Sequence, residues 1–64
     1  MNKEELTNIV KDVVFNDEKY TQYYVSKFGI NQGNFNNYRN GKRKIEGMQL
    51  KTVLKLIDVY NSKQ

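Results

Sequence analysis

Residues 21–44, TQYYVSKFGINQGNFNNYRNGKRK, contain the most informative pattern of the chain, that of two helices and a turn. A short helical pattern over residues 21–28 ends at Gly29, because glycine readily adopts the left-handed conformation that closes a helix. Asn31 follows as a favoured N-cap residue, and residues 32–39 are predicted to form the next helix. Two short helices joined by a tight turn are therefore expected here.

The predicted helix over residues 32–39 has an unusual composition. Five of the ten residues from Asn31 to Asn40 are asparagine, which is a poor helix former. The only large apolar residues are Phe35 and Tyr38, which are three apart and are predicted to face the core. An amide carries a donor and an acceptor side by side, so it can pair bidentately with an adenine edge in the major groove. We therefore expect this helix to present its amides outward.

Both ends of the chain show the three-and-four spacing of apolar residues that is typical of amphipathic helices. The spacing predicts a first helix over residues 3–15 and a closing helix over about residues 48–62. No segment of five or more residues alternates as a strand does. We therefore predict the all-α class and a compact single domain, residues 1–64, of four or five helices. The apolar residues with this spacing in the closing helix are Leu50, Val53, Leu54, Ile57 and Tyr60.

The positive charge is concentrated in the middle of the chain. The net charge is +4, but residues 20–51 hold six basic residues against one acidic residue, whereas residues 1–19 hold three against five. Such a basic segment favours an anionic partner, most often a phosphate backbone, although a solvated basic surface would have the same composition. A Lys-Arg-Lys loop, residues 42–44, directly follows the amide-rich helix.

The composition also excludes several classes of protein. There is no cysteine and no histidine, so disulfides, zinc fingers and catalysis by Cys or His are ruled out. Acidic residues are sparse and no glycine motif for phosphates is present, so we expect no enzyme, cofactor, metal or small-molecule ligand. The longest apolar run, residues 13–15, is too short for a membrane span or a secretory signal, and a cytoplasmic protein is expected.

Residues 20–60 resemble the helix-turn-helix of the phage repressor and Cro-like (XRE-type) DNA-binding domains. Gln22 opens the first helix of the motif, Gly29 and a hydrophobic residue make the turn, and an Asn-Gly pair with basic residues follows the second helix. The family usually places a small residue four positions before the turn glycine, where this chain has Val25. The resemblance implies a lambda-repressor-like domain with residues 32–39 as the recognition helix in the major groove.

The resemblance also implies roles for individual side chains. The outward positions that read base edges in the family are occupied by Gln32, Asn36 and Asn37. Gln22 matches a glutamine that meets a phosphate and braces the reading helix, with simple exposure as the alternative. Asn31 matches a residue that caps this helix and can touch a phosphate. The positions that contact phosphates beside the groove are occupied by Arg39, Asn40, Lys42, Arg43 and Lys44.

Together these features predict a sequence-specific, double-stranded DNA-binding transcriptional regulator that acts as a homodimer. Dimerisation is expected because one such module makes a small interface, and the family pairs half-sites about 34 Å apart. For Tyr20 and Tyr23 two alternatives remain: each phenol binds a phosphate, or each ring covers an exposed edge of the core or a dimer contact. The alternatives are a protein-interaction module of the same fold, such as an antitoxin or an antagonist of a regulator, and an RNA-binding protein. The candidate dimer contacts are Leu56, Val59 and Tyr60, or Tyr23.

Overall fold

The computed structural model describes residues 2–64, which form helices and no strand. The elements are α1 (Lys3–Phe15), α2 (Gln22–Ser26), α3 (Gln32–Arg39), a short 3-10 helix η1 (Ile45–Gly47) and α4 (Leu50–Ser62). The predicted four-helix, all-α class is confirmed, and η1 is the only addition to the predicted elements in the part that the structure describes. None of the helices in residues 2–64 is long and apolar enough to cross a membrane.

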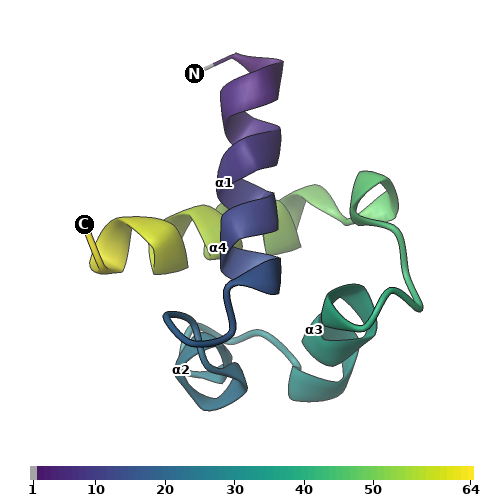
Figure 1. Cartoon of the computed structure of the whole chain (residues 1–64), viewed down its shortest axis with the longest axis vertical. Helices are drawn as coiled ribbons and strands as arrows, with labels where there is room; N and C mark the ends of the chain where they lie inside the picture. Colours follow the sequence, from purple (N-terminus) through teal and green to yellow (C-terminus); the bar gives the residue numbers. More distant parts are fainter. Residues whose placement is uncertain (1) are drawn as a thin grey trace.

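Two pairs of helices build the fold. Figure 1 shows α1 standing upright across α4, with α2 and α3 side by side below the crossing. The two pairs are α1 with α4 and α2 with α3, and contacts between α1 and α3 join one pair to the other. Helices α2 and α3 are joined by a tight turn in which Gly29 has a φ of +81°. This arrangement leaves the outer face of α3 open to solvent at one end of the molecule.

Local side-chain caps explain where the helices begin. Asn2 accepts a hydrogen bond from the backbone N–H of Glu5 at 2.8 Å, and Thr21 caps α2 in the same way. The N-cap predicted at Asn31 is confirmed. Helix α1 has the predicted bounds, but α2 ends at Ser26 because the next residues tighten into i→i+3 hydrogen bonds before the turn.

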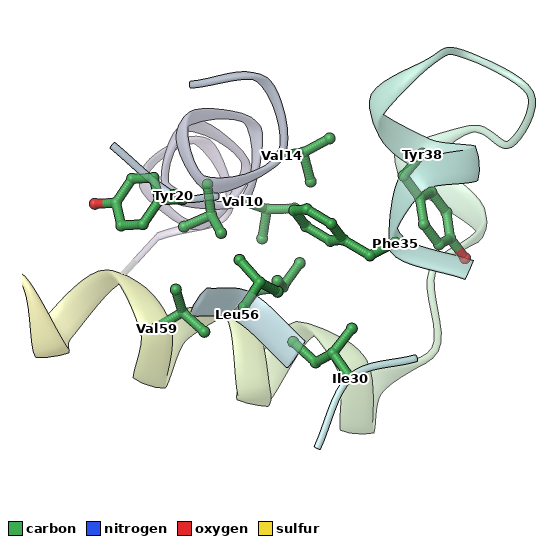
Figure 2. Close-up of a cluster of buried hydrophobic side chains, with 10 residues drawn as sticks. Val10, Val14, Tyr20, Ile30, Phe35, Tyr38, Leu56 and Val59 are labelled. Carbon is green, nitrogen blue, oxygen red and sulfur yellow. The ribbon is translucent and has the colours of Figure 1, made fainter. Parts of the chain in front are cut away.

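The core lies between α1, α3 and α4 (Figure 2). The buried ring of Phe35 points from α3 towards α1 and α4, as its position in the sequence predicted. Tyr38 is buried as well, and Tyr20 is 0% exposed. Tyr20 is therefore a core residue and is not available for phosphate. The buried cluster comprises Val10, Val13, Val14, Tyr20, Val25, Ile30, Phe35, Tyr38, Leu56 and Val59.

Helix α4 turns a different face inward than its most obvious apolar spacing suggested. Leu56 and Val59 are fully buried, whereas Leu50 and Leu54 are exposed. The prediction that Leu56 and Val59 form a dimer contact is therefore wrong. The sequence of α4 contains two apolar stripes, and the contacts with α1 bury the stripe that contains Leu56 and Val59.

Candidate nucleic-acid interface

The outer face of α3 carries amide side chains. Gln32, Asn34 and Asn36 are exposed, and Asn37 is half-buried. The Asn31 side chain accepts from the backbone N–H of Asn34 at 3.0 Å, so its oxygen is used in capping the helix. Phe35 and Tyr38 hold the opposite face of α3 against the core. The amides are therefore presented outward, as the sequence predicted.

A hydrogen bond ties the first residues of α2 and α3 together. Gln22 Nε2 donates to Gln32 Oε1 at 3.2 Å. This contact matches the bracing role that the resemblance implied for Gln22. The Gln32 amide oxygen has two lone pairs, so it can accept from Gln22 and from a second donor at once, and the Gln32 NH₂ group remains free to donate. The pair fixes the direction of the Gln32 side chain at the N-terminus of α3.

The position where the chain departs from the family pattern is filled without disturbing this contact. Val25 lies four residues before Gly29 and is fully buried in the core. The hydroxyl of Ser26 donates to the carbonyl of Tyr23 within its own turn. The larger side chain is therefore accommodated by the core, and α2 still brings Gln22 to Gln32.

The basic loop after α3 is held against the end of that helix. The backbone N–H of Arg43 donates to the carbonyl of Asn37 at 3.0 Å, and that of Lys42 donates to Asn40 Oδ1 at 3.1 Å. The side chains of Lys42, Arg43 and Lys44 are all exposed. The loop backbone is thus anchored while its three charges extend into solvent beside the amide face.

A polar groove separates the start of α3 from the start of α4. Phe35 and Tyr38 are among the residues that line it. Helix α4 begins at this groove without a side-chain cap, so its first backbone N–H groups and the positive end of its dipole favour an anion there. The polar side chains that line the groove include Asn31, Asn34, Arg43, Lys51, Thr52 and Lys55.

Three residues of α4 in this groove were not predicted from the sequence, namely Lys51, Thr52 and Lys55. Lys51 and Lys55 are four residues apart and therefore project from one side of α4. This spacing was a usable signal, but nothing in the sequence placed that side of α4 next to α3. The Lys55 ammonium also donates to the carbonyl of Gly29 at 2.9 Å, which ties α4 to the turn between α2 and α3.

Arg39 has a different role from the predicted phosphate contact. Its guanidinium donates to the carbonyls of Val14 at 2.6 Å, Tyr20 at 2.7 Å and Val13 at 3.1 Å. The guanidinium also lies over the Phe35 ring, 4.5 Å from its centroid. These carbonyls are at and beyond the C-terminal end of α1, where a cation is favourable. We therefore assign Arg39 a structural role.

The environment of Arg39 agrees with this role. Burial lowers the pKa of its guanidinium from the ordinary value, and the negative charge of Asp17 opposes the shift. The ordinary pKa of arginine is so high that the group keeps its charge at neutral pH. The half-buried guanidinium thus keeps its positive charge while it donates to backbone oxygens of α1 and of the following connection.

The comparison with known proteins does not extend these observations. No protein-family model, curated protein or solved structure matches this chain. Among residues 2–64, no group of three or more metal-ligating side chains is placed to hold an ion. The features that distinguish this surface are its outward amides, its anchored basic loop and its lysine-lined groove.

Proposed function

We propose that the protein is a sequence-specific, double-stranded DNA-binding transcriptional regulator that inserts α3 into the major groove. The observation that carries the proposal is the amide face of α3, flanked by the exposed loop of residues 42–44 on one side and by the lysine-lined groove on another. The resemblance to the phage repressor and Cro-like (XRE-type) domains supports the same conclusion. Cytoplasmic location and a homodimeric state belong to this proposal.

In the proposed complex the amides read sequence. Gln32 and Asn36 are exposed on α3, and each presents a donor and an acceptor that match the N6 and N7 positions of adenine. Gln22 holds Gln32 through its side chain, which lowers the entropy lost when Gln32 pairs with a base. Asn37, which is half-buried, contributes at the edge of the reading face. We also propose that Gln22 contacts a phosphate while its side chain stays hydrogen-bonded to Gln32.

The basic side chains supply affinity that does not depend on sequence. Arg43 and the neighbouring loop lysines are exposed, and Lys51 and Lys55 lie along the groove at the start of α4. A phosphate backbone that follows the groove would meet these charges and the uncapped N-terminus of α4. Arg39 is left out of this contact set, whereas Asn31 and Asn40 remain in it at the two ends of α3.

The direct test is selection from a random-sequence duplex pool at low salt. We expect enrichment of a defined motif with adenine at the position that Gln32 reads. Binding without any enriched motif would contradict sequence-specific recognition. Absence of duplex binding at low salt would contradict the proposal as a whole and would favour the protein-interaction module of the same fold.

Replacing Gln32 with alanine is expected to relax discrimination at one base pair by about 5- to 100-fold, because one bidentate contact is lost. Gln22→Ala, which keeps Gln32 but removes its brace, should lower discrimination at the same base pair by less. Asn8→Ala serves as the matched control, since Asn8 is an exposed amide on α1. Competition binding with the selected site and its single-base variants measures the effect. A uniform loss across all variants would contradict base reading by Gln32.

Replacing Arg43 with alanine is expected to weaken binding to all duplexes by a similar factor and to reduce the slope of log K against log salt by about 0.9. The physical reason is that one fewer counterion is released from the phosphates. Lys3→Ala removes the same charge from exposed α1 and should leave the slope unchanged. A change of base preference in Arg43→Ala, or an equal effect in Lys3→Ala, would contradict a local phosphate contact.

A further inference from the structure

Helix α4 carries a second apolar stripe that faces solvent. Leu50 is 70% exposed and Leu54 is 53% exposed, and Ile57 continues the stripe as a half-buried residue. The spacings of four and three residues are those of a coiled-coil seam. At about 100° per residue, this seam lies on the side of α4 turned away from the buried Leu56 and Val59.

We propose that α4 pairs with α4 of a second copy of this chain in an antiparallel arrangement through this seam. A narrow apolar stripe with this spacing is suited to packing against another helix, because its side chains enter the spaces between those of the partner. This inference rests in part on the proposed function, because the antiparallel direction is argued partly from DNA binding. The pairing would join two α3 helices into one DNA-binding unit. Its apolar contacts are independent of DNA.

The charges beside the seam fit a second copy of the same chain. Lys51 and Asp58 are exposed, seven residues apart, and lie along one edge of the stripe. In an antiparallel pair Leu54 faces Ile57 of the second copy, which brings Lys51 close to Asp58 of the second copy. Two-fold symmetry forms this opposite-charge pair twice. The surface is therefore self-complementary in both apolar spacing and charge.

A parallel pair lacks this complementarity. In a parallel arrangement the edge that holds Lys51 and Asp58 would face the opposite edge of the second copy, where Val53 and Tyr60 lie. No opposite charge is present among those residues. The sequence around the seam therefore favours the antiparallel direction.

The antiparallel direction also agrees with DNA binding by two copies. Lys51 and Lys55 mark the edge of α4 that faces α3, and this edge is roughly a quarter turn from the seam. The two-fold axis of an antiparallel pair is perpendicular to both α4 helices, so both of these edges face the same side of the pair. Both α3 helices are then directed to that side. A parallel pair would direct them to opposite sides, where one duplex could not meet both.

The first test is the monomer–dimer equilibrium without DNA, measured by sedimentation over a range of concentrations. Leu54→Glu is expected to raise the dimer dissociation constant by about 100-fold or more, because a charge enters the apolar seam of both copies. Phe15→Glu is the matched control, since Phe15 is equally exposed at 53% but lies on α1. Circular dichroism checks that both variants fold. A monomeric wild type, or equal effects of the two variants, would overturn the proposal.

The charge pair provides a second test with no change in the apolar seam. Asp58→Lys is expected to weaken the dimer by about 10-fold, because Lys51 of the other copy then meets a like charge twice. The double variant Lys51→Asp with Asp58→Lys should restore the wild-type dissociation constant. Lack of restoration would overturn the antiparallel pairing of these residues.

The direction of pairing can be read by cross-linking, because the natural chain has no cysteine. Leu50 and Asn61 face each other across the proposed antiparallel seam. An equimolar mixture of Leu50→Cys and Asn61→Cys is expected to form mainly the mixed disulfide under mild oxidation. Predominance of the Leu50→Cys homodimer would overturn the antiparallel arrangement. All three experiments omit DNA, so a failed dimer surface and a failed DNA-binding function give separate results.

Discussion

Replacing Phe35 with alanine is expected to leave about half of the protein or more unfolded at room temperature. The Phe35 side chain is 2% exposed and links α3 to the core between α1 and α4. Removing a buried phenylalanine side chain costs about 3–5 kcal/mol, because both its burial and the packing around it are lost. A single core in a domain of this size supplies about the same free energy of unfolding.

Phe15→Ala is the matched control, because Phe15 is the same residue type but is 53% exposed at the end of α1. Its free energy of unfolding is expected to stay within about 1 kcal/mol of the wild type. Urea denaturation followed by circular dichroism at low protein concentration measures both variants. A folded Phe35→Ala variant with a loss below about 1 kcal/mol would contradict the role of Phe35 as the anchor of α3.

Replacing Arg39 with methionine is expected to lower the free energy of unfolding by about 2–3 kcal/mol. This loss is smaller than the summed contribution of three fully buried charge-assisted hydrogen bonds, because the guanidinium is partly open to water. Three carbonyls of α1 and its following connection lose their donor. Arg39→Lys should recover only part of the loss, because one ammonium lacks the planar fork that reaches all three oxygens. Urea denaturation measures the change in each variant.

Arg43→Ala provides the comparison for Arg39, since Arg43 is exposed in the neighbouring loop. Its stability is expected to remain within about 0.5 kcal/mol of the wild type, because its side chain is a solvated surface group. If Arg39 were a phosphate contact, Arg39→Met would instead keep the stability of the wild type and bind DNA more weakly, because it lacks the charge. Equal stability of wild type and Arg39→Met would therefore contradict the structural role.

The helices were predictable because their signals are local. The bounds of α1 and α3 follow from the three-and-four spacing and from caps such as Asn31, whose partner is three residues away. The turn at Gly29 was predictable because it needs a residue in the left-handed backbone conformation, which glycine adopts most readily. The end of α2 was less predictable, because its last turn tightens where the chain enters the turn to α3.

The candidate interface was predictable in part. The amides of α3 and the basic loop were found because they are consecutive in sequence and flank the core residue Phe35. Lys51 and Lys55 were not assigned, because their place beside α3 depends on how α4 packs. The same limitation applied to Arg39, whose hydrogen-bond partners lie 19 to 26 residues away along the chain.

Local sequence patterns were enough to predict the all-α class, the order of the helices, the turn at Gly29 and the outward amides of α3. Each depends on spacing and capping within a few residues, where backbone geometry leaves few alternatives. The choice between the two apolar stripes of α4 depends on helix packing, which buries Leu56 and leaves Leu54 in solvent. Helix packing also directs Arg39 inward, because only the packed fold brings the carbonyls of α1 and Tyr20 within its reach.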